Sequence, residues 1–122
     1  MINIKKIIKE KEIFYYNIKN IRAVLFLNQQ VFFNKSGLEH LVRKGKHLRN
    51  NRDQIRRLNL LKYVDKILQS YNGNVEYRCI NNNKITTHFW GITVFVEGQK
   101  IKVVIRKINN GKLTFLSIMN QK

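Results

Sequence analysis

The sequence predicts an α+β fold in which N-terminal helices pack on a four-stranded antiparallel sheet. Two observations lead to this class: an amphipathic helical stripe within residues 53–71, and four β-rich runs after residue 74 joined by short polar turns. Helices followed by a run of strands are typical of α+β domains. We expect one domain over residues 1–122, with basic helices at about 36–71 and an antiparallel meander at about 75–119.

The first part of the chain is less defined. Residues 2–19 mix Ile, Lys and Tyr without clear end signals, so a short helix and an edge strand both remain open. A small hairpin is expected next, because β-rich runs at 21–27 and 31–33 flank three polar residues. Ser36 then has the character of a helix N-cap, and Glu39 completes a capping box, which predicts a helix over about 37–48.

The clearest helix begins at Asp53. Apolar side chains recur there at helical spacing while the cations lie largely off that stripe, so one side of the helix is expected to face the core. The helix should end near residues 71–73, where Asn or Gly can adopt the left-handed conformation. The apolar stripe consists of Ile55, Leu58, Leu61, Val64, Ile67 and Leu68.

Four strands are expected at 75–80, 85–96, 101–108 and 112–119, with two-residue turns at 82–83, 98–99 and 110–111. Because side chains alternate between faces, these turns fix which residues share a face. The predicted core face carries Val75, Tyr77, Trp90, Ile92, Val94, Val96, Ile101, Val103, Ile105, Leu116 and Ile118. The predicted opposite face carries Arg78, Thr87, Phe89, Thr93, Phe95, Lys102, Val104, Arg106, Phe115 and Ser117.

The charge of the chain indicates a polyanionic partner. Twenty-four Lys and Arg face seven Asp and Glu, giving a net charge of +17, which costs self-repulsion in the folded state. Composition alone leaves RNA, DNA and anionic lipid open. AT-rich codon usage is a competing explanation for the Lys, Asn and Ile content, although it does not favour Arg over Asp and Glu in the same way.

The face opposite the core mixes cations, hydroxyls and rings, which suits nucleic acid, because cations meet phosphates and exposed rings stack on bases. The alternative is that Phe89, Phe95 and Phe115 pack beneath the N-terminal segment as a second small core. A second basic group lies on the helices, where a solvated basic surface is the alternative for any single Lys. The predicted nucleic-acid-binding residues are Lys46, His47, Arg49, Arg52, Arg56, Arg78, Thr87, Phe89 and Lys102.

Several kinds of site are not supported by the sequence. The seven acidic residues are scattered without a pair at Mg²⁺-ligand spacing, and one Cys with three separated His does not suit zinc. A Gly-rich phosphate loop and a Gly-flanked nucleophilic Ser are also lacking. We therefore expect neither a metal nor a cofactor.

Metal-free cleavage remains open for RNA, whose 2′-hydroxyl can act as an internal nucleophile. The protein then needs proton transfer and cations for the charge that develops on the phosphate. His40 and His47 are the better candidates for proton transfer, because His88 is expected on the core side near Tyr77. Helical spacing would place His40, Lys44 and His47 on one side of the first basic helix.

Three stretches of the chain resemble a known group of nucleases. The segment SGLEHLVRKGKHLR, the amphipathic helix after it and the closing GITVFVEGQKIKVVIRKINNGKLTFLSIMN resemble the phage and toxin branch of the barnase, EndoU, colicin and RelE (BECR) nuclease superfamily. The resemblance covers roughly residues 31–120. It implies helices followed by a four-stranded antiparallel sheet, and a metal-independent ribonuclease that attacks tRNA or mRNA. By resemblance the catalytic positions are His40, Lys44 or Lys46, Arg106 and Ser117.

The leading hypothesis is thus a toxin-type RNA endonuclease of phage, mobile-element or other bacterial origin. A non-catalytic nucleic-acid-binding module, such as a phage or plasmid regulator, is the main alternative, and a peripheral protein on an anionic membrane is the third. An acidic immunity protein or antitoxin is the expected protein partner. A single Cys and no apolar run near the ~20 residues of a spanning helix predict a cytoplasmic protein that does not insert into a membrane.

If the helices cover the core face, His40 and Arg106 would lie on different sides of the sheet. They can then form one site only if the helix that carries His40 reaches past a sheet edge.

Overall fold

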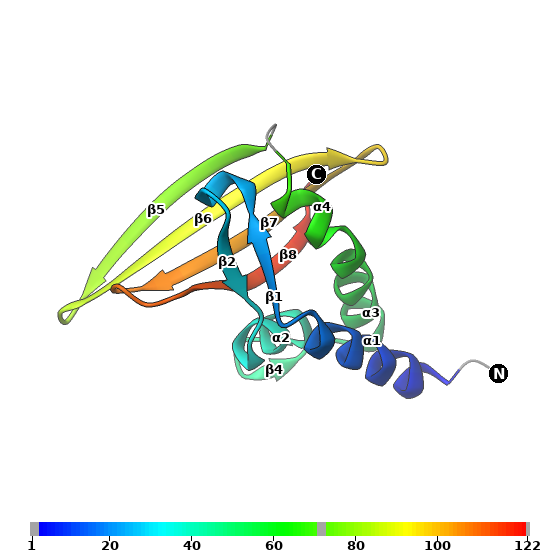
Figure 1. Ribbon diagram of the computed structural model, residues 1–122. Helices are drawn as coiled ribbons and strands as arrows, with labels where there is room; N and C mark the ends of the chain where they lie inside the picture. Colours follow the sequence, from blue (N-terminus) through cyan, green and yellow to red (C-terminus); the bar gives the residue numbers. More distant parts are fainter. Residues whose placement is uncertain (1–2, 71–72, 122) are drawn as a thin grey trace.

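A computed structural model of the chain, in which residues 3–70 and 73–121 are described, shows a mixed α+β fold built on a six-stranded sheet (Figure 1). The strand order is β1-β2-β8-β7-β6-β5, and a separate two-stranded hairpin pairs β3 with β4. The helical elements are α1 (Ile4–Ile18), η1 (Val24–Phe26), α2 (Lys35–Val42), α3 (Asn51–Asn59), η2 (Leu60–Tyr63) and α4 (Val64–Leu68). The strands are β1 (Asn20–Ala23), β2 (Gln29–Phe32), β3 (Arg43–Lys44), β4 (His47–Leu48), β5 (Asn74–Asn82), β6 (Ile85–Val96), β7 (Gln99–Ile108) and β8 (Leu113–Asn120).

The α+β class is confirmed, but the four-stranded antiparallel sheet is wrong as a description of the whole sheet. The β5–β8 meander is antiparallel throughout, as predicted. The β1–β2 hairpin, expected as a separate feature, extends this sheet, because β2 pairs in parallel with β8 through Val31↔Leu113 and Phe32↔Thr114. Pairing between such distant segments has no local signal in the sequence.

The open question at the start of the chain is settled in favour of a helix. α1 begins after Asn3, whose side chain accepts a hydrogen bond from the backbone N–H of Lys6. The Tyr15 ring from this helix is fully buried, and its hydroxyl donates to the carbonyl oxygen of Asn34 at 2.5 Å. Tyr15 packs against Phe33 and Phe115, so α1 is attached to the sheet through an aromatic cluster.

α2 is shorter than predicted and is capped by a different residue. The N-cap is Asn34, whose side chain accepts from the N–H of Gly37, so the predicted capping box at Ser36 is wrong. The helix ends at Val42, and residues 43–48 form the β3–β4 hairpin. Gly45 has a φ of 63°, a conformation that favours glycine, and this turn ends the predicted helix early.

The amphipathic segment after residue 50 is helical, as predicted, but it is interrupted. α3 is capped by Asn50, the chain tightens into η2, and α4 continues to Leu68. The apolar stripe faces the core: Leu58, Leu61, Val64, Ile67 and Leu68 are buried and Ile55 packs against them. Of the predicted helix end at 71–73, residues 71 and 72 lie outside the described residues.

The predicted sheet faces are correct except near one β-bulge. The two turns at 83–84 and 97–98 are each one residue away from their predicted places, which shifts the pairing by two positions and keeps every side chain on its expected face. A bulge between Val104 and Ile105 changes the β7–β8 register on the side of the turn. Phe115 therefore lies opposite Ile105 in the core, where Leu116 was expected, and Thr114 lies opposite Arg106.

Among the described residues no helix combines the length and the apolar character that crossing a membrane requires.

Candidate functional site

A row of side chains crosses the sheet on the face that points away from the core. Arg78 of β5 pairs with Phe89 of β6, Phe89 pairs with Arg106 of β7, and Arg106 pairs with Thr114 of β8. Residues paired in this way have Cβ atoms roughly 4.5–5.5 Å apart on the same face. We call this surface the open face, and the row places two arginines on either side of one aromatic ring.

A groove on the open face continues this row towards Lys102. The Arg78 guanidinium lies 5.1 Å from the centre of the Phe89 ring, a cation–π arrangement that fixes both side chains. Gly91 has no side chain, and the Lys102 stem lies across it, with Cε 2.5 Å from where a Cβ would sit. The groove has a cavity volume of about 360 Å³. Its lining residues are Glu76, Tyr77, Arg78, Phe89, Gly91, Lys102 and Val104.

At the other end of the row, Arg106 reaches the helix that carries His40. Its Nη2 donates a hydrogen bond to Ser36 Oγ at 3.1 Å, although Ser36 belongs to α2. β8 pairs with β2 only up to Thr114, and α2 packs against β8 just beyond this point. Since His40 follows Ser36 by one helical turn, this bond brings Arg106 close enough to His40 for its charge to act on the imidazole.

Glycine at position 37 makes this approach possible. A Cβ on Gly37 would lie 2.6 Å from the carbonyl oxygen of Phe115 and 2.9 Å from its ring, and it would also meet the Tyr15 hydroxyl. The backbone of α2 therefore lies directly on β8. This contact sets the distance between Ser36 and Arg106.

A small cavity of about 140 Å³ opens beside Ser36, and we call it the α2 pocket. It is lined by Ser36, Glu39, His40, Arg43 and Gly45. The pKa of His40 is lowered from its usual 6.5, first by partial burial, then by the positive charges of Arg106 and Arg49, while Glu39 opposes the shift. The imidazole is therefore neutral at a pH where a free histidine is already partly protonated.

This electrostatic coupling gives a testable pKa for His40. We expect its imidazole to titrate below 6.5, and we expect Arg106→Gln to raise the midpoint because one of the lowering charges is removed. The measurement is an NMR titration of the His40 ring protons, assigned with a His40→Gln variant. Lys66→Gln, on α4, is the control and should leave the midpoint unchanged. A His40 midpoint at or above 6.5, or one insensitive to Arg106→Gln, would show that the two side chains are not coupled.

Arg49 links the backbone of α2 at His40 to Asp53 of α3. Its guanidinium donates to the backbone carbonyl of His40 at 3.4 Å and forms an ion pair with Asp53 at 3.3 Å, and its side chain is only 13% exposed. Asp53 also pairs with Arg56 and lies 4.0 Å from Arg57, and the hydrogen bond from Arg56 is the main reason that the pKa of Asp53 is lowered. Arg49 is predicted to bind nucleic acid; in the structure its guanidinium contacts the backbone of His40 and the Asp53 carboxylate.

The other predicted residues lie at varying distances from this site. Lys44, Lys46 and His47 are exposed on the β3–β4 hairpin. Lys44 pairs there with His47, so the expected alignment of Lys44 and His47 with His40 along one helix is wrong. Arg52 is exposed at the start of α3, and Thr87 lies on the open face, two residues from Phe89 along β6.

Ser117 lies outside the α2 pocket. It is paired with Val104 on the open face, but its side chain is 8% exposed, which leaves little of it accessible to a phosphate. Ser36 offers a hydroxyl in the α2 pocket instead. The sequence does not single out this hydroxyl, because Ser36 has the character of an N-cap there. A cap at Asn34 leaves the Ser36 hydroxyl available, and Asn before a helix is as strong a cap signal as Ser.

Comparison with known proteins adds no identification. No family model, curated protein or solved structure matches this chain.

The part of the chain that the structure describes contains no group of three or more His, Cys, Asp or Glu placed to hold a metal ion. The α2 pocket instead presents the Ser36 hydroxyl, the His40 imidazole and the Arg43 guanidinium, with the Glu39 carboxylate also in its lining. Arg106 joins them through its bond to Ser36, so cationic and hydroxyl donors that suit an anion outnumber the single carboxylate. The arrangement can bind a phosphate next to a neutral imidazole.

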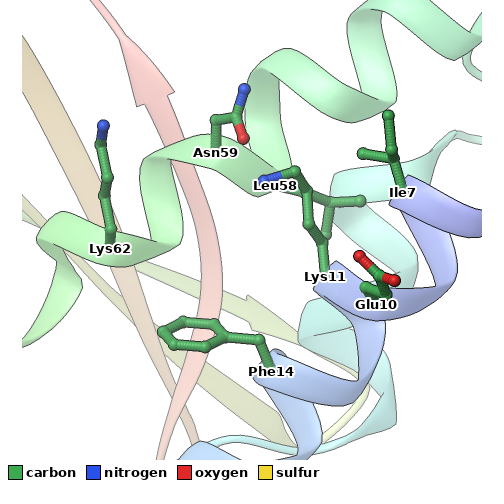
Figure 2. Close-up of a pocket in the computed structure, with 7 residues that line it drawn as sticks. All are labelled: Ile7, Glu10, Lys11, Phe14, Leu58, Asn59 and Lys62. Carbon is green, nitrogen blue, oxygen red and sulfur yellow. The ribbon is translucent and has the colours of Figure 1, made fainter. Parts of the chain in front are cut away.

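A further pocket lies between α1 and the α3–η2 segment, as Figure 2 shows. Its cavity volume is about 370 Å³, and it combines apolar side chains with two lysines and one glutamate. It shares no lining residue with the α2 pocket or the open-face groove. Its lining residues are Ile7, Glu10, Lys11, Phe14, Leu58, Asn59 and Lys62.

Proposed function

We propose that this protein is a metal-independent RNA endonuclease of the toxin type, related to the phage and toxin branch of the BECR nucleases. The observation that supports this most is the link between Arg106 of β7 and Ser36 of α2, which brings a sheet cation next to the helix turn that carries His40. Cations that were merely scattered over the surface would not require a bond between the sheet and α2. The resemblance of the three stretches to this branch supports the same proposal.

The proposed reaction uses the RNA as its own nucleophile. Neutral His40 takes the proton of the 2′-hydroxyl while the 2′ oxygen attacks the adjacent phosphorus. The bond from phosphorus to the 5′ oxygen then breaks, and the departing oxygen takes up a proton from solvent. The products are a 2′,3′-cyclic phosphate and a 5′-hydroxyl end. The lowered pKa of His40 keeps the imidazole able to accept a proton at neutral and mildly acidic pH.

Arg106 is proposed to stabilise the negative charge that develops on the phosphate. A guanidinium carries five N–H donors, so one bond to Ser36 leaves donors over for phosphate oxygens. Arg43 lines the same pocket, and the lysines of the β3–β4 hairpin lie next to it in the chain. These cations are proposed to hold the backbone of the RNA on both sides of the cleaved bond.

The direct test is to incubate the purified protein with total RNA in the presence of EDTA. We expect cleavage with 2′,3′-cyclic phosphate ends, and His40→Gln is expected to lower the rate at saturating RNA by about 10²- to 10⁴-fold, because the proton acceptor is lost. His47→Gln is the matched histidine variant. It should weaken RNA binding but leave the saturated rate unchanged, since His47 lies on the exposed hairpin.

RNA that stays intact at micromolar protein contradicts the nuclease proposal. Cleavage that His40→Gln does not slow contradicts the assignment of His40. Both results are read against thermal unfolding of each variant, which shows whether the variant is folded.

A second candidate function is a nucleic-acid-binding module without catalysis. The open-face groove favours it, because Arg78, Phe89 and Lys102 offer cations and a ring without involving the α2 pocket. The two functions differ in the behaviour of His40→Gln. An enzyme loses cleavage and keeps RNA affinity, whereas a module shows no cleavage in any form and loses affinity with Arg78→Ala.

The proposed function carries expected partners with it. The substrate is RNA, either tRNA or mRNA, and the site of action is the cytoplasm of the producing or target cell. A small acidic antitoxin or immunity protein would complement a chain with a net charge of +17.

A further inference from the structure

Three aromatic side chains form a cluster on the other face of the sheet, away from the α2 pocket. Tyr77 of β5 and Trp90 of β6 are cross-strand partners, and His88 lies two residues before Trp90. The His88 ring is nearly parallel to both others, at 23° to Tyr77 with centres 5.9 Å apart and at 20° to Trp90 with centres 5.8 Å apart. We call Tyr77, His88 and Trp90 the aromatic platform.

The platform is held in place by defined contacts. The Tyr77 hydroxyl and His88 Nδ1 are hydrogen-bonded at 2.6 Å, which fixes both rings at their polar ends. Phe26 of η1 packs edge-on against Trp90 with ring centres 5.3 Å apart, so Trp90 is anchored to the core. The cluster is therefore ordered before any ligand arrives, which lowers the entropy cost of binding.

The platform is nevertheless open to solvent. Tyr77 is 55% exposed, and the three rings together with Lys107 line a cavity of about 400 Å³. Lys107 is the cross-strand partner of His88, so its charge lies beside the rings. The helices gather at the other end of the sheet in Figure 1, which leaves the end of β5 and β6 nearest their connecting turn without a helical cover.

We propose that the aromatic platform binds an unpaired nucleobase of single-stranded RNA, with Lys107 on the neighbouring phosphate. Ordered, solvent-exposed rings beside a cation are the arrangement that proteins use to bind single strands, because every base has a face that can stack. The net charge of +17 favours a polyanion over an apolar protein surface as the occupant.

The position of β5 connects this second subsite to the first. β5 is the edge strand of the sheet, and its neighbours Tyr77 and Arg78 lie on opposite faces. A single strand that contacts Arg78 and Phe89 on the open face needs only to pass round this edge to reach Tyr77. A duplex is too wide and stiff to make this turn, so the substrate is proposed to be single-stranded around the cleaved bond. This inference rests on the proposed function for the identity of the ligand as RNA.

The chain provides its own reporter for the test. Trp90 is the only tryptophan in the sequence, so the intrinsic tryptophan fluorescence reports on the platform alone. The wild-type protein is titrated with a short oligothymidylate, which has bases but no 2′-hydroxyl and cannot undergo the proposed cleavage. An abasic oligodeoxynucleotide of equal length has the same phosphates without bases. We expect the first to quench Trp90 and the second to bind without quenching.

Variants separate the rings from the charge. Tyr77→Ala is expected to weaken oligothymidylate binding by about 5- to 100-fold and to leave abasic binding unchanged. Tyr16→Ala removes a tyrosine of similar exposure on α1 and should change neither affinity. A thermal unfolding curve shows whether Tyr77→Ala still folds. If it does not, the quenching difference between the two oligonucleotides still decides the question in the wild type.

Equal quenching by both oligonucleotides, or by neither, overturns the platform proposal. Trp90 emission that changes with protein concentration alone overturns it too, because the rings would then serve contact between copies of the chain. The ribonuclease proposal is judged separately. Base-dependent quenching with uncleaved RNA leaves the platform standing without the nuclease, and cleavage without base-dependent quenching leaves the nuclease without the platform.

Discussion

Arg106→Lys is expected to reduce RNA cleavage at saturating substrate by about 10²- to 10³-fold, the cost of losing one donor to a developing oxyanion. Lysine keeps the positive charge but loses the planar fork that can hold Ser36 and a phosphate together. The measurement is the single-turnover rate of cleavage of a short RNA. RNA affinity should change much less, because the lysine ammonium still attracts the negatively charged phosphate.

Arg78→Lys is the matched control, since Arg78 lies in the same row with Phe89 between it and Arg106. It should weaken binding without lowering the single-turnover rate. A rate that falls equally in both variants would mean that the whole row only binds RNA. An Arg106→Lys protein with full activity would remove Arg106 from the proposed reaction.

Gly37→Ala is expected to lower the free energy of unfolding by about 1–3 kcal/mol, the usual cost of adding a methyl group where no space exists. The new Cβ would meet the carbonyl oxygen of Phe115 at 2.6 Å, and a backbone atom in a paired strand cannot move aside as a flexible side chain can. Urea unfolding measures this loss. Cleavage should fall as well even in the folded fraction, because α2 can accept the methyl group only by moving away from β8, which lengthens the Arg106–Ser36 contact.

Lys35→Ala lies on the same helix with its side chain 80% exposed, and its unfolding free energy should stay within about 0.5 kcal/mol of wild type. If Gly37→Ala were equally neutral, the close approach of α2 to β8 would have to be looser than described.

The sequence was sufficient for the elements whose signals are local. Apolar spacing identified the helical segment after residue 50, and alternation identified β5–β8 together with the face of nearly every strand residue. Alternation alone placed Arg78, Phe89 and Arg106 on one face, whereas their cross-strand pairing depends on turns that lie one residue away from the predicted places. The predicted faces stayed correct although two turns were misplaced by one residue, because the pairing then shifts by two positions and the side chains alternate with a period of two.

The incorrect predictions have physical causes that cannot be seen in a local sequence pattern. The predicted helix over 37–48 includes Gly45, but the positive φ of Gly45 belongs to a turn. Lys44 and His47 therefore lie on a hairpin and not on the helix. Because of the bulge beside Ile105, Phe115 occupies the core position that was expected for Leu116. The Phe115 ring, a candidate for base stacking, therefore belongs to the core. Phe89 is half-buried under Arg78, Phe95 is 74% exposed and Phe115 packs into the main core, so the three rings do not form a second core.

The proximity of Arg106 to the helix that carries His40 depends in part on a pairing that has no local signal in the sequence. β2 is anchored to β8, and the chain passes from β2 directly into α2. The parallel pair therefore positions the helix that carries His40. The packing of Gly37 on β8 and the Arg106–Ser36 bond hold α2 in the same place.

The parallel pairing of β2 with β8 also limits when the sheet can be completed during synthesis of the chain. Val31 leaves the ribosome long before its partner Leu113, so the N-terminal hairpin has no strand to join until translation has passed through the last hairpin of the sheet. Contacts of such high sequence separation form late in folding, after the local hairpins. We therefore expect His40 and Arg106 to come together only after β8 has emerged and has paired with both β2 and β7.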